Sequence, residues 1–371
     1  MKFGFTRRRM MQTLGSGAVL AAPMAPPATG AFNDWPIEEG PATPKICLGV
    51  GRTSDIGLRE VKQLGVNYVL RGGPRIPWQV EQLQEMMDTY KAANLTLANL
   101  MIGGFDNAIY GRPGKDEEID KVRQSIRAAG KVGLPVVEYN FYAHRAMEGY
   151  YGETGRAGAG YTAFDYDRMK GLPPLEKEGA HSLEEMWNNV AYFLKAIVPV
   201  AKESNVRLAL HPNDPPAPMS RGSGQIMGTV EGWKKLVDIV PGPHNGITFD
   251  CGVTREMGQN PVEVCRYFMK KDCINHVHFR NVVVRKPYEK YTEVFIDEGQ
   301  VDMFGVMREL VKGKYPRLIY PEHPRAMEAD HADSSDTASM FKSGYPGGGS
   351  YTGYAYNVGY TRAMLQAALE V

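Results

Sequence analysis

The sequence predicts an α/β protein of the (β/α)₈ barrel class, and two observations lead to this fold. From residue 45 onward, short apolar runs with β-strand character alternate with amphipathic stretches at helical spacing. Eight such runs are each followed by a helical stretch, which is the element count of this barrel. The alternative is an open, doubly wound sheet, which normally begins with a glycine-rich phosphate turn. Gly49-Val50-Gly51-Arg52 lacks the rest of that fingerprint.

Each expected strand is a short apolar run, and each expected helix is a longer segment whose apolar residues recur every three or four positions. The expected strands are 46–50, 68–70, 95–100, 136–139, 207–210, 246–250, 275–279 and 317–320. The expected helices are 56–64, 78–93, 115–130, 183–204, 229–240, 261–269, 301–311 and 358–369. Segments 141–180 and 325–357 show little periodicity, so we expect long loops after the fourth and eighth strands, over the catalytic face. With no repeat and no second domain evident, residues 45–371 are expected to form a single catalytic barrel.

The composition argues against two classes of function. The chain has 371 residues, with 43 Lys and Arg against 42 Asp and Glu, so its formal net charge is +1. This balance lacks the basic footprint of a nucleic-acid-binding protein, and no apolar run is long enough for membrane embedding. The four cysteines contain no CxxC pair and are too scattered for a disulfide scaffold.

The N-terminus resembles a twin-arginine export signal. Thr6-Arg7-Arg8-Arg9-Met10-Met11 fills the motif, and an apolar stretch at 14–22 and a small, proline-rich run at 21–30 follow it. The alternative is a basic, unstructured N-terminus. We therefore expect residues 1–30 to be a signal segment that brings the chain to the twin-arginine (Tat) export machinery. Its destination is then the periplasm or the cell exterior, and because that pathway moves folded proteins, a metal would be acquired before export.

Groups that can bind a metal follow four successive strands. His211 follows the fifth strand, Cys251 the sixth, His278 the seventh and Glu322 the eighth. In a barrel these positions converge on one site, and imidazole, thiolate and carboxylate all bind divalent transition metals. Each residue alone has a structural explanation, but the four together favour a metal site. This donor set permits Mn²⁺, Fe²⁺ and Zn²⁺.

Further polar residues stand near the same strand ends. Arg280 shares a strand face with His278 and either binds an anionic substrate group or pairs with a nearby acid. Asn281 stands where that strand turns into its loop. His323 and Tyr354, the latter expected in the last loop, are candidate proton carriers. Three other residues are expected to be structural: Cys265, Cys273 and His276.

Several segments, in order, resemble the mannonate dehydratase family. They are His211-Pro212-Asn213-Asp214-Pro215-Pro216, Cys251-Gly252, His278-Phe279-Arg280-Asn281 and, after the fourth strand, Tyr139-Asn140-Phe141. The resemblance implies a xylose isomerase-like (β/α)₈ barrel that uses Mn²⁺ or Fe²⁺. It also implies the metal ligands His211, Cys251, His278 and Glu322, the catalytic residues His323 and Tyr354, and the substrate-binding residues Arg280, Asn281 and Asn140.

The sequence departs from the family's pattern in several places. Asn213 and Glu322 stand where the family has Asp, and Phe279 stands for Leu. The loop after Asn140 usually carries an Asp-Trp-Thr-Arg stretch, whereas here it reads Ala143-His144-Arg145-Ala146-Met147-Glu148-Gly149. We therefore expect different substrate contacts in this loop. The export signal is a further departure, because the family is typically cytoplasmic.

The resemblance implies a lyase of hexuronate degradation that dehydrates D-mannonate, or a closely related sugar acid, to 2-dehydro-3-deoxy-D-gluconate and water. Two alternatives remain open: a metal-dependent sugar isomerase or epimerase on the same barrel, and a non-catalytic periplasmic carbohydrate-binding barrel. A cysteine ligand disfavours the first alternative, and a complete set of ligands with His323 beside it disfavours the second. The sequence is compatible with a homo-oligomer.

Overall fold

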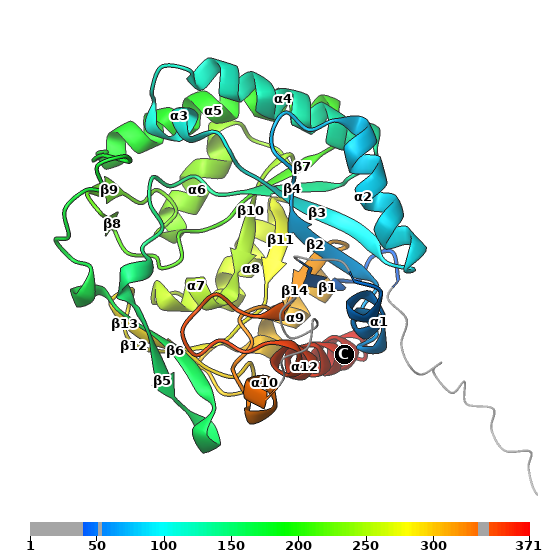
Figure 1. Cartoon of the computed structure of the whole chain (residues 1–371). Helices are drawn as coiled ribbons and strands as arrows, with labels where there is room; N and C mark the ends of the chain where they lie inside the picture. Colours follow the sequence, from blue (N-terminus) through cyan, green and yellow to red (C-terminus); the bar gives the residue numbers. More distant parts are fainter. Residues whose placement is uncertain (1–39, 51–53, 333–340) are drawn as a thin grey trace, which may run out of the picture. The chain divides into compact units, whose positions relative to one another are not determined.

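The computed structural model describes residues 40–50, 54–332 and 341–371. The expected signal segment, 1–30, lies outside the described residues. Eight parallel strands close into a barrel in the order β1-β14-β11-β10-β7-β4-β3-β2. Figure 1 looks into this barrel, with the strands at its centre and the helices around them. The predicted (β/α)₈ fold is thus confirmed.

All eight expected strands are present, with ends shifted by no more than two residues. They are β1 (Lys45–Gly49), β2 (Tyr68–Gly72), β3 (Thr96–Ile102), β4 (Val136–Tyr139), β7 (Arg207–Leu210), β10 (Asn245–Asp250), β11 (Ile274–His278) and β14 (Leu318–Tyr320). Every residue of β10 and β11 is buried, as expected for parallel strands covered on both faces. The register sets Asp250, His278 and Tyr320 side by side on neighbouring strands, so the chain segments that follow them emerge at one rim.

The eight expected helices are also present. They are α1 (Asp55–Gln63), α2 (Val80–Ala92), α4 (Lys115–Lys131), α5 (Leu183–Glu203), α6 (Val230–Ile239), α8 (Pro261–Lys270), α9 (Met303–Lys312) and α12 (Tyr351–Leu369). Their starts follow local rules: Ser182 and Glu185 form a capping box on α5, and Asn260 caps α8 ahead of Pro261. Short helices and 3₁₀ turns occupy the loops: α3 (Asp106–Tyr110), α7 (Cys251–Glu256), α10 (Glu328–Ala332), η1 (Met147–Gly149), η2 (Arg156–Gly158) and η3 (Tyr166–Arg168).

The expectation of an irregular loop at 141–180 is wrong. The segment contains β5 (Tyr150–Thr154) and β6 (Gly160–Asp165), which join the unpredicted hairpin β12 (Val282–Lys286) and β13 (Lys290–Glu293). These four strands form an antiparallel outer sheet in the order β12-β13-β6-β5, visible beside the barrel in Figure 1. The outer sheet has its own small core, in which the Phe164 and Tyr291 rings stack with centroids 5.1 Å apart. Its two hairpins join through β6 and β13, which pair across more than a hundred residues of sequence, and a local pattern does not reveal this pairing. A two-stranded ribbon, β8 (Met219–Ser220) and β9 (Ser223–Gly224), completes the strands of the described chain.

The expected start of the last helix is also wrong. Helix α12 begins at Tyr351 rather than at 358, so Tyr354 lies in its first turn and not in a loop. The early turns are rich in Gly and Tyr, and the preceding Ser350 makes no capping hydrogen bond, so the local sequence gives little sign of them. Tertiary contacts stabilise these turns: Asp330 accepts from the backbone N–H of Thr352 at 3.0 Å, and Tyr354 is buried in the main core.

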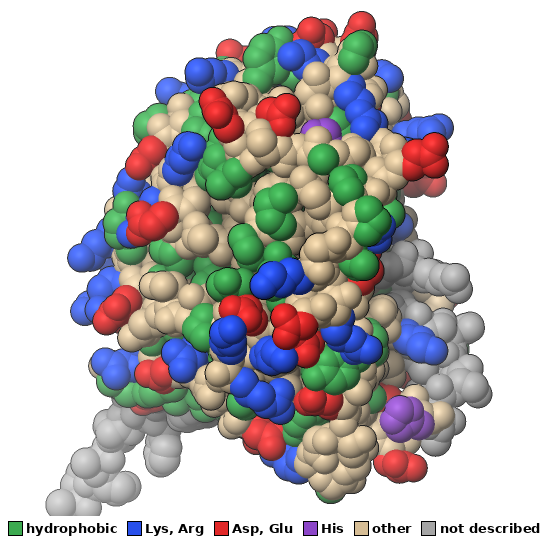
Figure 2. Space-filling view, turned by 90° about the vertical axis from the view of Figure 1, so that its left-hand side faces the viewer, with side chains coloured by type: hydrophobic (Ala, Val, Ile, Leu, Met, Phe, Trp, Pro, Cys, Tyr) green, Lys and Arg blue, Asp and Glu red, His purple; other side chains and the backbone are tan. Residues whose placement is uncertain are grey.

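The surface mixes both signs of charge. On the face shown in Figure 2, basic and acidic side chains are interspersed, as the net charge of +1 leads one to expect. Among the described helices, none has both the length and the apolar character needed to cross a membrane.

Candidate metal centre

The predicted site residues gather around a cavity of about 330 Å³ at the carboxyl ends of the barrel strands. Six of them line it: Asn140, His211, His278, Glu322, His323 and Tyr354. A larger hollow of about 650 Å³ lies between α1 and α2, but it contains none of the predicted residues. Active sites of (β/α)₈ barrels lie at the carboxyl ends of the strands, so the smaller cavity is the candidate site.

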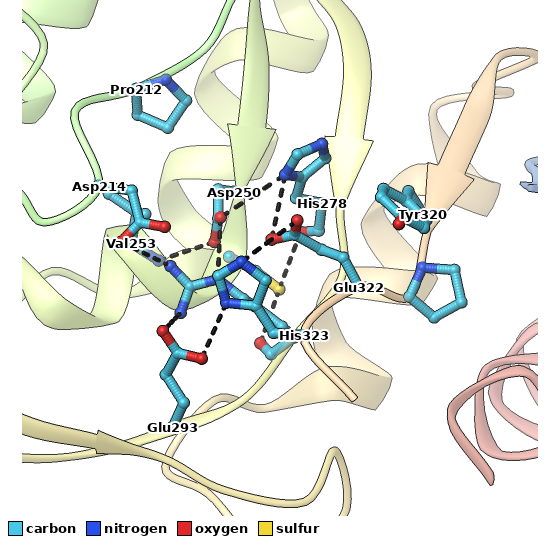
Figure 3. Close-up of polar contacts among 12 residues, drawn as sticks. Pro212, Asp214, Asp250, Val253, His278, Glu293, Tyr320, Glu322 and His323 are labelled. Carbon is cyan, nitrogen blue, oxygen red and sulfur yellow. Dashed lines mark hydrogen bonds and ion pairs between the residues drawn. The ribbon is translucent and has the colours of Figure 1, made fainter. Parts of the chain in front are cut away.

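Three of the four predicted ligands meet in this cavity. Nε2 of His211 lies 3.2 Å from Nδ1 of His278. The same nitrogen of His278 lies 3.1 Å from Oε1 of Glu322, a contact that Figure 3 shows. Oε1 of Glu322 is buried and makes no hydrogen bond of good geometry among the described residues, although Nδ1 of His278 and Nε of Arg280 lie within ion-pair distance of it. Two imidazoles and a carboxylate oxygen at this spacing fit a divalent transition metal.

Two carboxylates that the sequence analysis missed, those of Glu138 and Asp250, also lie beside the His278 ring. This ring lies between Glu138, whose Oε1 is 3.6 Å from Nε2, and Asp250, whose Oδ2 is 3.9 Å from Nδ1. Two groups of potential ligands therefore share this histidine: Glu138 with His211 and His278, and Asp250 with His278 and Glu322. The signal for Glu138 is a lone charge inside the apolar strand β4, and Asp250 directly precedes Cys251.

The fourth predicted ligand, Cys251, lies apart from these two groups. It is the first residue of α7, and its Sγ donates to the carbonyl oxygens of His278 at 3.4 Å and Arg280 at 3.3 Å. Burial raises the pKa of this thiol, because a thiolate would lose its hydration. A bound metal ion would favour the thiolate, and the role of Cys251 as a ligand stays a prediction.

Two of the predicted substrate contacts, Arg280 and Asn281, follow strand β11 and do not line the cavity. Arg280 donates from Nε to Asp250 at 3.0 Å and from Nη1 to Glu256 at 2.6 Å, which matches its ion-pair interpretation. The Asn281 amide nitrogen donates to the carbonyl of Ile296 at 2.9 Å, and its oxygen accepts from the backbone N–H of Val301 at 2.9 Å. Both side chains are buried and stabilise the loop that follows β11.

His323 is placed as a proton carrier would need to be. Its ring lines the cavity, its Nδ1 lies 2.8 Å from Oε2 of Glu293, and its Nε2 lies 3.5 Å from Oε2 of Glu322. Burial opposes the charged ring, but the carboxylates of Glu293 and Glu322 outweigh burial and raise the pKa of His323. Glu293 comes from the outer sheet, so sequence patterns did not connect it with the barrel.

Of the remaining predicted residues, two line the cavity and three are buried in the core. The Tyr354 hydroxyl lies 2.7 Å from that of Tyr320, and burial raises the pKa of Tyr354, so the phenol is protonated at neutral pH. Asn140 lines the cavity, with its amide nitrogen 3.7 Å from Sδ of Met101. His276 is fully buried, as expected for a core residue, and burial lowers its pKa to about 4. Cys265 and Cys273 are buried as well.

The fold and the site together define a xylose isomerase-like barrel with a candidate metal centre at the carboxyl ends of its strands. Solved structures with this fold include a xylose isomerase-like TIM barrel protein from Mycobacterium smegmatis in complex with magnesium. Its TM-score is 0.56 at 15% identity, over 88% of this chain and 98% of that one. At such low identity the likeness shows the fold alone.

The more specific comparisons agree on one family. The model of D-mannonate dehydratase (UxuA) matches residues 47–174 and 164–370. A mannonate dehydratase of Streptococcus pneumoniae (strain 70585) is 28% identical over 312 residues, covering 76% of this chain and 85% of that protein. The mannonate dehydratase structure from Streptococcus suis serotype 2 has a TM-score of 0.77 at 25% identity, over 88% of this chain and 94% of that one. The chain belongs to the mannonate dehydratase family of hydro-lyases.

Proposed function

We propose that this protein is a metal-dependent hydro-lyase that dehydrates D-mannonate to 2-dehydro-3-deoxy-D-gluconate and water. One observation carries the proposal within this family. Two imidazoles and a carboxylate converge in a cavity that His323 also lines, so three of the predicted metal ligands lie beside the predicted proton carrier. The sugar epimerases that share the fold do so at low identity, for example L-ribulose 3-epimerase at 12%, and this likeness does not favour their chemistry.

The residues that would hold the metal are His211, His278 and Glu322, with Cys251 as the fourth predicted ligand. We propose Mn²⁺ or Fe²⁺, because the resemblance to the mannonate dehydratase family implies these ions and the mixed nitrogen, sulfur and oxygen donor set permits both. When bound, the ion supplies positive charge that stabilises negative charge developing on the substrate oxygens.

The chain's own residues would move two protons. Dehydration breaks the C2–H bond and the C3–O bond, and the departing hydroxyl takes up a proton to leave as water. The enol that remains then becomes the 2-keto product by moving its hydroxyl proton to C3. His323 and Tyr354 both line the cavity and would divide the roles of base at C2 and acid at the leaving oxygen. The ion pair with Glu293 would keep the His323 ring in place throughout.

The test is proton NMR of D-mannonate incubated with the metal-loaded protein. We expect the C2–H signal to disappear and C3 methylene signals to grow. His323→Asn should bind the metal but lose turnover, and Cys251→Ala serves as the metal-site control. Unchanged D-mannonate with metal bound would contradict the proposal. Conversion of a ketose or aldose instead would support the isomerase alternative.

We also propose that the chain is exported through the twin-arginine pathway, on the strength of Thr6-Arg7-Arg8 and the segment that follows it. Cell fractionation of the full chain should find it outside the cytoplasm. Replacing Arg7 and Arg8 together by Lys should retain it in the cytoplasm. An unchanged distribution in that variant would contradict export by this route.

Gel filtration of the purified protein would test self-association.

A further inference from the structure

An arginine that the sequence analysis did not single out lines the candidate site. Arg145 belongs to the segment between β4 and β5 and stands on the cavity wall. Its Nη2 donates to the Tyr345 hydroxyl and lies 3.8 Å from Oδ2 of Asp214, and its guanidinium carbon lies 5.1 Å from the centroid of the Tyr345 ring. These contacts come from two different loops, so they hold the guanidinium over the cavity.

Arg145 differs from the other cations near the site. Arg280 does not line the cavity, and carboxylates surround it: Asp214, Asp250, Glu256, Glu293 and Glu322. Lys342 lines the cavity but is exposed, and it offers a point charge rather than a planar fork of donors. Within the described part of the cavity wall, Arg145 is the one guanidinium that faces the space a substrate would fill.

Two series of contacts connect Arg145 with residues of the candidate site. The buried Asp214 carboxylate contacts two guanidinium groups: its Oδ2 lies 3.8 Å from Nη2 of Arg145, and its Oδ1 lies 3.5 Å from Nη2 of Arg280. The Nε of Arg280 is in turn 3.3 Å from Oε1 of Glu322. On the other side, the Tyr345 ring lies between Arg145 and the His323 ring, whose centroid is 4.6 Å away.

We infer that Arg145 binds the carboxylate of the substrate and makes the cavity selective for sugar acids over neutral sugars. The inference rests on the proposed function and names a specificity-determining residue for it. A guanidinium matches a carboxylate with two parallel N–H donors, and among the described residues the hydrogen bonds of Arg145 use Nε, to the Asp214 carbonyl at 3.5 Å, and Nη2, to the Tyr345 hydroxyl, rather than Nη1. Arg145 and His323 both contact the Tyr345 ring, so a carboxylate bound at Arg145 would lie toward the part of the cavity wall that His323 lines, as abstraction of the adjacent C2 proton by His323 would require.

The experiment compares Arg145→Gln with Lys342→Gln, because both variants remove one positive charge from the same cavity wall. Binding of D-gluconate and of D-glucitol, a neutral alcohol of the same length, is measured by titration calorimetry on the metal-loaded proteins, so the result does not depend on turnover. In the parent protein D-gluconate should bind more tightly than D-glucitol. Arg145→Gln should weaken D-gluconate by about ten- to a hundredfold and leave D-glucitol within about twofold, as expected for a lost charge-assisted bond. Lys342→Gln should largely keep the preference for the acid.

Folding is checked by the thermal unfolding midpoint, which should change little because Asp214 keeps Arg280 and Tyr150 as partners. The inference is overturned if Arg145→Gln keeps the preference for the acid, or if Lys342→Gln loses it instead. A parent protein that dehydrates D-mannonate while Arg145→Gln keeps its selectivity would uphold the proposed function alone. A parent protein that does not dehydrate D-mannonate but selects acids through Arg145 would uphold this inference alone.

Discussion

Nδ1 of His323 lies 2.8 Å from Oε2 of Glu293, so a carboxylate from the outer sheet holds the ring of a residue that follows the last barrel strand (Figure 3). Nη2 of Arg325 donates to the same oxygen at 2.9 Å. Burial works against ionisation of Glu293, but His323 and Arg325 outweigh it and lower the pKa of this carboxyl. The outer sheet is therefore part of the site and not only a decoration of the barrel.

Glu293→Gln should lower kcat and leave metal binding intact. The glutamine keeps the size of the side chain but loses the charge that fixes the His323 ring, and we expect a loss in kcat of about ten- to a hundredfold. The measurement is steady-state kinetics together with metal content. Glu153→Gln is the matched control, since Glu153 lies in β5 of the same sheet and accepts from Thr292 at 2.9 Å. Equal losses in both variants would point to damage to the sheet rather than to a role in positioning His323.

Glu138→Gln should weaken metal binding. The Glu138 carboxylate accepts hydrogen bonds from Thr248 at 2.7 Å and from Asn99 at 2.8 Å. These bonds hold the carboxylate beside Nε2 of His278, whereas Glu322 lies beside Nδ1 on the other side of the ring. A carboxylate beside Nε2 favours the tautomer that leaves Nδ1 free for the metal, and its loss should reduce affinity by about ten- to a hundredfold. Chelator competition measures this, with Glu118→Gln, outside the cavity, as control. An unchanged metal affinity in Glu138→Gln would contradict the role of Glu138 in orienting the His278 ring.

Removal of one predicted ligand should remove the metal. His211→Ala and Cys251→Ala are both expected to lose stoichiometric metal and with it the activity, because each takes one donor from the set. Elemental analysis of the purified variants gives the metal content. If Cys251→Ala keeps a full equivalent, the centre consists of His211, His278 and Glu322 without sulfur, and the Cys251 thiol is a buried structural group.

Asp272 should make stability depend on pH at the end of the barrel away from the site. It pairs with Arg207 at 2.7 Å and with Arg317 at 2.9 Å. Partial burial opposes ionisation, but the two arginines outweigh it and lower the pKa of Asp272. A lowered pKa stabilises the fold above the unfolded-state value, and this contribution is lost as the pH falls through the folded-state value.

The test is urea unfolding of the parent protein and of Asp272→Asn. Because the pair is partly exposed, we expect the variant to be less stable by about 0.5–1 kcal/mol at pH 7, with the gap narrowing as the pH falls below the unfolded-state pKa. A gap that stays the same as the pH falls would contradict an electrostatic origin and indicate a change in the turn before β11 instead.

Where local periodicity sets the structure, the sequence predicted it well. The eight barrel strands appear where the apolar runs predict them, because parallel strands that are covered on both faces consist largely of apolar residues. Once the strands are placed, barrel geometry brings their carboxyl ends together, which is why His211, His278 and Glu322 could be grouped before any coordinates were known. Tyr354 was found as a candidate but assigned to a loop, since the first turns of α12 depend on burial rather than on helix propensity.

The sequence by itself determined the barrel, the rim on which the candidate site lies and three residues of the candidate metal centre, His211, His278 and Glu322, since these follow from strand periodicity and chain order. Only the tertiary structure decided how the charges pair. It enclosed Arg280 among carboxylates, placed Arg145 on the cavity wall and brought Glu293 to His323 from a sheet of distant segments. Ion pairs and hydrogen bonds require positions within a few ångströms, and contacts between residues far apart in the chain carry no periodic signal that a single sequence could show.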